Sequence, residues 1–362
     1  MKGFMCLMAL GQVCVGFGFA SENSDSVFVK PLILGEQKNM EMTNHGWISG
    51  YLQQQYFSSD KGGTNSGFFR NRRTRLAYNY IGDEKTMGRF SIEFASGSNH
   101  STAQVREAYI KYKPNAIKNP SGPSLTIGAQ DIPMGYENTL SSSAILWSER
   151  SVYQSAFFNS EVSKGLLFQN GDANTYWFVG LFDSLTIGDP EQSDSTTKGE
   201  IMPVYGVHSK MGAFEGGLSA MSGNRPAYSA GAISLARTDR NFTYADLRYH
   251  PNGSKLDIRG EYMIGKDRIP LAAVATANKV KGGHVNVEYK LNDMDTAIFR
   301  YETFDHNSDA AGQIQTLFGA GATKDVSANM RLGLWADWNK VPTNAAGQRS
   351  FKTLTFRVQF KF

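Results

Sequence analysis

The last ten residues of the chain, TLTFRVQFKF, alternate without interruption between apolar and polar side chains. The apolar positions are Leu354, Phe356, Val358, Phe360 and Phe362. This period of two is the pattern of a β-strand with one apolar face. A strand that exposes such a face and an unpaired edge to water promotes aggregation. The chain must therefore adopt a fold that covers the face and pairs the edge of its final strand.

Segments with the same alternation follow one another from residue 46 to the end, as in RFSIEFAS and SKLDIRGEYMIG. Many have about ten residues, the length that a tilted strand needs to cross the hydrocarbon core of a membrane. A soluble β-sandwich shows the same alternation. A membrane barrel is favoured because short turns alternate with longer polar loops and because aromatic residues gather near the strand ends, as in interfacial girdles. These aromatic residues are Trp47, Tyr78, Tyr80, Tyr112, Trp338, Phe360 and Phe362.

The candidate strands number one too many for an even barrel with both termini on the periplasmic side. The weakest candidate is 228–236, which is rich in small residues, and we assign it to an outer loop. Near the C-terminus, 312–318 and 325–338 are predicted as separate strands. The sequence thus predicts an all-β protein, a transmembrane antiparallel β-barrel of about 16 strands, with about 14 or 18 as alternatives.

The N-terminal residues 1–20 have one lysine, then an apolar run, then the small residues Gly18 and Ala20. This pattern predicts a secretory signal peptide. The alternative, a transmembrane anchor, is disfavoured because the run is short and is followed by polar residues. Both cysteines lie inside this segment, so the mature chain is expected to form no disulfide. Residues 21–45 are predicted to be an N-terminal extension, and 46–362 the barrel.

Composition excludes several classes of protein. No later stretch approaches about 18 consecutive apolar residues, which excludes a helical membrane protein. The net charge of +4 is too small for a polybasic nucleic-acid binder, so no nucleic-acid partner is expected. None of the histidines lies in a nucleophile motif or has metal-ligand spacing. We therefore expect no catalytic residues, no metal and no cofactor, and predict that the protein is not an enzyme.

One connection, residues 131–161, is far longer than a compact fold normally tolerates without a function. Its apolar and aromatic content predicts that it folds inward and narrows a water-filled lumen. The alternative is an extracellular lid. The candidate constriction residues are Asp131, Tyr136, Glu137, Trp147, Glu149 and Arg150.

Six stretches, in this order, resemble the phosphate-selective porin O and P family of Gram-negative outer membranes: FFRNRRTRLAYNYIG, GRFSIEFA, QVREAYIKYKP, LTIGAQDIPMGYE, ILWSERS and GLLFQNG. The resemblance spans residues 46 to about 170. It implies a barrel in the bacterial outer membrane, surrounded by lipid, that is usually a homotrimer with the third loop constricting its pore. It also implies that the barrel-assembly machinery recognises the terminal strand, with Phe360 and Phe362 as its signal.

Charged residues on the lumen face decide which ions such a pore prefers. If Leu76, Tyr78 and Tyr80 face lipid, Arg73 and Arg75 face the lumen, and Arg72 has the opposite parity and is expected at the interface. Lumen cations favour anions. The candidate pore-lining residues are Arg72, Arg73, Arg75, Lys111, Arg259 and Arg331, with Arg357 on the same parity.

Carboxylates of the same parity weaken the prediction of an anion preference. Any one arginine has about even odds of simply forming an ion pair with a neighbouring carboxylate on the wall. These carboxylates are Glu93, Glu107, Asp257, Glu261, Glu288 and Asp337. An acidic loop that faces a basic wall would instead create a transverse field. We predict a passive porin for small hydrophilic solutes with a mild anion preference, phosphate being one candidate solute. A non-conducting structural or adhesin-like barrel is the alternative.

Overall fold

The structure is a computed structural model. It describes residues 45–61, 66–95, 103–158, 162–189, 191, 199–230, 232–268, 277–342 and 350–362. The predicted signal peptide and N-terminal extension lie outside the described residues, apart from His45 at the start of the first strand.

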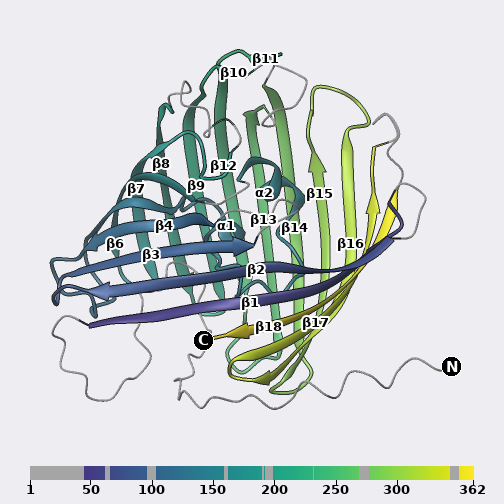
Figure 1. Cartoon of the computed structure of the whole chain (residues 1–362), viewed down its shortest axis with the longest axis horizontal. Helices are drawn as coiled ribbons and strands as arrows, with labels where there is room; N and C mark the ends of the chain where they lie inside the picture. Colours follow the sequence, from purple (N-terminus) through teal and green to yellow (C-terminus); the bar gives the residue numbers. More distant parts are fainter. Residues whose placement is uncertain are drawn as a thin grey trace.

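Sixteen antiparallel strands of the described residues form one closed barrel, which confirms the predicted fold class (Figure 1). Neighbouring strands along the chain pair with each other, and the first pairs with the last. The barrel strands are β1 (His45–Ser59), β2 (Ser66–Ile81), β3 (Thr86–Ala95), β4 (Gln104–Tyr112), β5 (Ser124–Asp131), β6 (Val162–Gly171), β7 (Thr175–Asp183), β8 (Ile201–Met211), β9 (Phe214–Arg225), β12 (Thr238–Tyr249), β13 (Leu256–Asp267), β14 (Asn278–Lys290), β15 (Asp295–Asp305), β16 (Ile314–Ser327), β17 (Met330–Lys340) and β18 (Phe351–Lys361).

The segment that we assigned to an outer loop does lie outside the barrel. It forms a two-stranded hairpin of β10 (Tyr228–Ala230) and β11 (Ile233–Leu235), and β9 pairs directly with β12. Two short helices, α1 (Tyr136–Thr139) and α2 (Val152–Phe157), belong to the connection between β5 and β6. Among the described residues, no helix is both long and apolar enough to cross a membrane.

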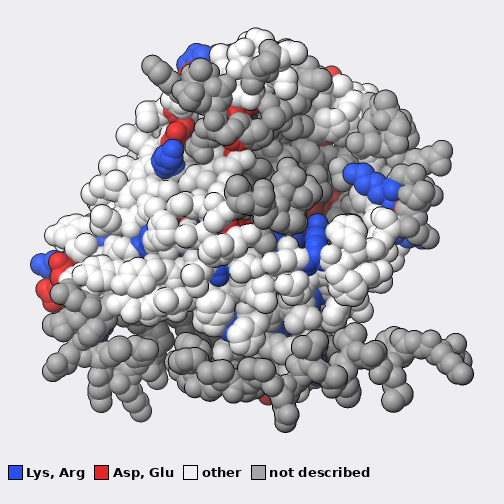
Figure 2. Space-filling view, viewed as in Figure 1, with Lys and Arg blue, Asp and Glu red and all other residues white. Residues whose placement is uncertain are grey.

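Burial alternates along the strands as the sequence predicts. On β2, Leu76 and Tyr78 are exposed on the outside, whereas Ala77 and Asn79 are buried on the inside. Uncharged residues dominate the barrel face in Figure 2. Apolar side chains in this position contact lipid, which covers the outer face of the final strand.

Six of the predicted girdle aromatics are exposed on the outside, but the prediction for Trp47 is wrong. Trp47 packs instead against the buried cluster of Ile81, Met87 and Ile117. The reason is parity, because Trp47 precedes the exposed Ile48 and therefore points inward.

The predicted break after residue 318 and the single strand 325–338 are also wrong. β16 continues to Ser327 and β17 begins at Met330, so the turn falls inside the predicted strand. The stretch after residue 318 looks like a loop in the sequence because it contains Gly319 and Gly321. In the structure, a Cβ atom on Gly319 would lie 2.3 Å from the ring of Trp147, and one on Gly321 would lie 2.3 Å from the ring of Trp335. The glycines are strand residues whose inward space is occupied by two indole rings.

The barrel closes at the last residue. The Gly50 amide donates to the Phe362 carbonyl at 2.8 Å, and the Phe362 amide donates to the Gly50 carbonyl at 3.1 Å. The ring of Phe362 lies where a side chain at position 50 would be, since a Cβ atom on Gly50 would meet it at 2.7 Å. These two bonds extend by one residue pair the seam between β1 and β18, which runs from Tyr51 opposite Lys361 to Ser59 opposite Thr353.

Candidate functional site

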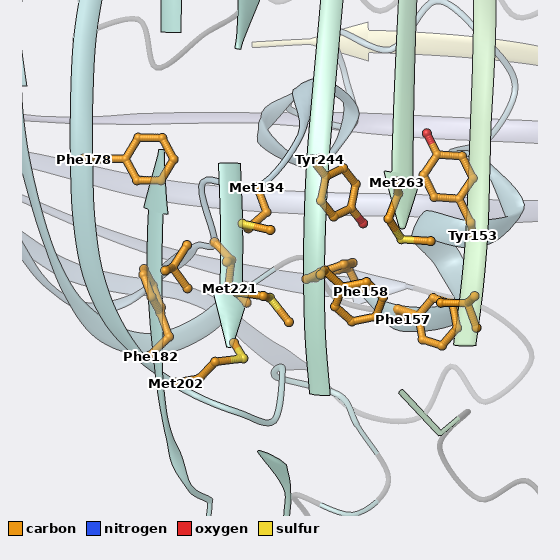
Figure 3. Packing of buried hydrophobic residues seen from close by; sticks show 14 of the residues in the cluster. Met134, Tyr153, Phe157, Phe158, Phe178, Phe182, Met202, Met221, Tyr244 and Met263 are labelled. Carbon is orange, nitrogen blue, oxygen red and sulfur yellow. The ribbon is translucent and has the colours of Figure 1, made fainter. Parts of the chain in front are cut away.

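The third loop, residues 132–158, folds into the barrel, where α1 and α2 lie inside the ring of strands (Figure 1). Its apolar side chains, among them Met134, Tyr153, Phe157 and Phe158, pack on the inner wall (Figure 3). The wall residues that receive them come from β7–β9 and β12–β15 and are Phe178, Phe182, Met202, Met221, Phe242, Tyr244, Met263, Val280 and Phe304. The loop removes these apolar wall residues from water, and this burial stabilises the inward position of the loop. The predicted inward fold of the loop is confirmed.

A second apolar cluster holds the middle of the loop against β15 and β17. Trp147 and Tyr136 pack with Ile298 of β15 and Trp335 of β17. Trp147 is only 3% exposed, and its ring lies in the space above Gly319. The predicted loop residues Tyr136 and Trp147 therefore act as anchors of the loop.

Glu137 and Arg150 fix the internal shape of the loop. The Glu137 carboxylate accepts from the Arg300 guanidinium at 2.9 Å and from the Ser151 amide at 2.7 Å. Arg150 donates to the carbonyl oxygens of Glu137 and Leu140. One acidic residue of the predicted set is thus neutralised by an arginine of β15.

Glu261 of β13 is a further anchor. Its carboxylate accepts from the Tyr153 hydroxyl at 2.8 Å, from the Gln154 side chain at 2.7 Å and from the Glu137 amide at 3.0 Å. The side chain is only 4% exposed. This lumen carboxylate therefore binds the loop, and it does not line an open path for ions.

The tip of the loop reaches the opposite wall at Glu149. Its carboxylate accepts from Arg72 Nε at 2.6 Å and from Arg72 Nη2 at 2.7 Å. Guanidinium nitrogens of Arg73, Arg357 and Arg70 lie 3.3, 3.4 and 3.6 Å from the same carboxylate. Burial alone would raise the pKa of Glu149, but the charges of Arg72 and Arg73 hold it well below its usual range. We call Arg70, Arg72, Arg73 and Arg357 the arginine cluster.

Arg72 belongs to this cluster because of a β-bulge, and its predicted place at the interface is wrong. In the pairing of β1 with β2, Gln53 faces Arg73 and Gln54 faces Asn71, so Arg72 is the extra residue. A bulge shifts the inside–outside alternation by one position and re-aims the side chain. Arg72 therefore turns inward beside Arg73.

The basic wall continues along β2, β3 and β4. Arg75 donates to Glu93 at 2.6 Å, and Arg106 Nε lies 3.9 Å from the same carboxylate. Arg106 is itself the extra residue of a second bulge, between β3 and β4. Nearer the periplasmic end, Arg89 donates to Glu107 at 2.8 Å.

The other predicted pore residues lie apart from the arginine cluster. Arg259 binds Asp257 at 2.8 Å, and its guanidinium lies 5.0 Å from the centre of the Tyr136 ring. Arg331 binds Asp325 at 2.6 Å beside the turn between β16 and β17. Lys111 lies on the inward side of β4 between the exposed Ile110 and Tyr112. Asp131 ends β5, where the loop begins.

Sequence reasoning missed a group of buried charges, which we call the charged hub. It consists of Arg225, Arg240, Arg268, Asp189, Glu191 and Asp267. Asp267 lies 3.1 Å from Arg225 Nε and 3.3 Å from Arg240 Nε, and all three side chains are fully buried. Arg240 also donates to the Phe157 carbonyl at 2.7 Å. The hub joins the end of the third loop to Ser184, Asp189 and Glu191. Parity was the one available signal, because Arg240 shares the inward parity of Phe242 and Tyr244.

A closed barrel with an apolar outer face and a loop folded into a charged lumen defines an outer-membrane channel. The family model of phosphate-selective porin O and P matches residues 48–214, which confirms the predicted resemblance over this part of the chain. The match and the closed barrel together support an outer-membrane channel of the porin type.

Solved structures with the same fold align over most of this chain and nearly all of their own length, but their sequence identity to it is low. An anion-selective porin from Comamonas acidovorans has a TM-score of 0.66 at 12% identity, over 88% of this chain and 100% of that one. The outer-membrane channel DcaP of Acinetobacter baumannii gives 0.63 at 11% identity, over 89% and 99%. OmpT of Vibrio cholerae, in its trimer form, gives 0.60 at 12% identity, over 88% and 100%. No curated protein sequence matches the chain.

Proposed function

We propose that this porin lets small hydrophilic solutes diffuse passively and prefers anions mildly. The observation that carries the proposal is the convergence of four guanidinium groups on the one carboxylate of Glu149 at the tip of the constriction loop. A surplus of positive charge at a narrow point lowers the energy barrier for anions and raises it for cations.

The loop carboxylates support the same preference. Glu137 is buried against Arg300, and Glu149 lies within the arginine cluster. The acidic loop that would create a transverse field is thus largely neutralised by arginines of the wall. The similarity to an anion-selective porin and to a trimeric OmpT is consistent with an anion-preferring homotrimer.

The test is a planar-bilayer recording with purified protein in a gradient of KCl. We expect stepwise conductance and a reversal potential whose sign shows that chloride is more permeant than potassium. A cation preference would overturn the proposed selectivity. The absence of any conducting steps would overturn the channel itself and favour a structural barrel.

We further propose that Phe362 is needed for assembly, as the resemblance implies. Deleting Phe362 removes the ring over Gly50 and the two backbone hydrogen bonds to Gly50 at one end of the seam. We expect a severalfold lower amount of folded porin in the outer membrane, measured by its heat-modifiable migration in gel electrophoresis. Phe362→Ala, which keeps the backbone bonds, separates recognition of the ring from closure of the seam. Unchanged amounts of both variants would contradict the proposal.

A further inference from the structure

The arginine cluster resembles a ligand site that already contains a ligand. Arg72 offers Nε and Nη2 to the two oxygens of Glu149 at 2.6 and 2.7 Å. This parallel pair of hydrogen bonds is the arrangement in which arginine recognises a carboxylate or a phosphate group. Glu149 thus occupies the cluster in the way that a carboxylate on a free solute would.

We infer that the arginine cluster binds the carboxylate group of a permeating solute, which takes the place of the Glu149 side chain during passage. The inference rests on the proposed function, because it needs an open, anion-preferring pore, and it names the chemical class of solute for that site. Glu149 is then a tethered competitor whose side chain sets how strongly the pore holds such a solute.

The donors are arranged for two oxygen atoms. Glu149 Oε1 accepts a hydrogen bond from Arg72 Nε and lies 3.4 Å from Arg357 and 3.6 Å from Arg70. Glu149 Oε2 accepts a hydrogen bond from Arg72 Nη2 and lies 3.3 Å from Arg73. A planar carboxylate satisfies this pattern with both of its oxygens. A phosphate group has further oxygens that need donors of their own. The geometry therefore favours a carboxylate over a phosphate.

The Glu149 side chain can leave without unfolding the loop, because separate contacts hold the residues on both sides of it. The Ser148 carbonyl accepts from Arg357, and Trp147 packs beside Trp335. On the other side, the Val152 amide donates to Glu302, and Arg150 binds two loop carbonyls. None of these contacts uses the Glu149 carboxylate.

A solute in the lumen can also reach the Glu149 carboxylate and the arginine cluster. The Glu149 side chain is 33% exposed, and those of Arg70 and Arg72 are 25% and 19% exposed. The cluster has four positive charges for the one negative charge of Glu149, so an incoming anion is attracted while Glu149 is still bound. A solute carboxylate then makes the contacts that Glu149 gives up, and the charge balance of the site is unchanged.

The experiment measures how acetate reduces chloride current through single channels of wild-type protein, Glu149→Gln and Glu107→Gln. Removing the competitor should lower the half-blocking acetate concentration about tenfold in Glu149→Gln, the factor that corresponds to about 1.4 kcal/mol. Glu107→Gln removes a lumen carboxylate that pairs with Arg89, outside the cluster, and should change the value less than twofold. If both variants lowered the half-blocking acetate concentration equally, a general electrostatic effect would explain the result, and the inference would be overturned.

Two further arms complete the test. Inorganic phosphate is compared with acetate at a pH where both carry one negative charge, and a phosphate block as strong as that of acetate would overturn the choice of carboxylate. Glu149→Asp, which shortens the side chain but keeps its charge, should give an intermediate value and serves if Glu149→Gln does not assemble. An unchanged acetate block in variants that still prefer chloride would refute this inference alone. Loss of anion preference in the wild-type protein would refute the proposed function.

Discussion

Replacing both Arg72 and Arg73 with glutamate is expected to reverse the ion preference of the channel. The double variant changes the charge beside Glu149 by four units at the point where the loop meets the wall. One charge about 4 Å from an ion is worth about 1 kcal/mol even at the dielectric constant of water, which is roughly a fivefold change in permeability. The reversal potential in a KCl gradient should therefore change sign.

A milder double variant replaces Arg72 and Arg73 with glutamine. It should weaken the anion preference without reversing its sign, because Arg70 and Arg357 remain. Arg237→Glu is the matched control. Arg237 is an arginine with a 59% exposed side chain that pairs with Glu200 outside the constriction. It should leave the sign of the reversal potential unchanged. If the double glutamate variant folds and still prefers chloride, the arginine cluster does not determine selectivity.

Replacing Asp267 with asparagine is expected to destabilise the porin strongly. The substitution keeps the shape of the side chain but removes the negative charge that two fully buried guanidinium groups share. Removing one partner from a buried ion pair typically costs about 3–5 kcal/mol, since the other charge stays buried with less compensation. Arg225 still lies 3.3 Å from Asp189, so the loss falls mainly on Arg240. We expect a loss of about 3–5 kcal/mol in the free energy of unfolding, measured by urea titration in lipid vesicles.

Asp309→Asn is the matched control for this loss. Asp309 pairs with Lys279 at 3.1 Å, but both side chains are at least 60% exposed. Exposed pairs contribute about 0–1 kcal/mol, so this variant should be nearly as stable as the wild-type protein. Because Arg240 also binds the Phe157 carbonyl, Asp267→Asn should in addition increase the current noise of the open channel. Equal stability of the two variants would show that the charged hub contributes little.

The sequence predicted the barrel because its repeating signal is local. Alternation of apolar and polar residues marks each strand, and the small residues of 228–236 distinguished a hairpin outside the barrel from a barrel strand. The requirement for an even number of strands then corrected the count. The inward fold of the third loop was predictable too, because Trp147 and Phe157 need an apolar partner that only the lumen provides.

The site was harder to predict, because its geometry depends on departures from regularity. The bulge at Arg72 shifts the parity of one residue, and no feature of NRRTR in the sequence shows where such a shift occurs. Gly319 and Gly321 resemble loop residues until the two tryptophans that fill their space are known. The charged hub combines residues of three strands, β9, β12 and β13, with residues of the two connections that follow β7 and β13. These residues lie far apart in the sequence and meet only in the folded barrel.

The seam between Gly50 and Phe362 has a consequence for the order of events in the life of the molecule. Every other neighbouring pair in the sheet joins strands that follow one another in the barrel order along the chain, but β1 pairs with β18 at the far end of the sequence. Until that pair forms, the growing sheet has two unpaired edges and an uncovered apolar face, which is the state most prone to join other chains. The barrel therefore has no closed form, and β1 keeps one uncovered edge, until β18 is in place.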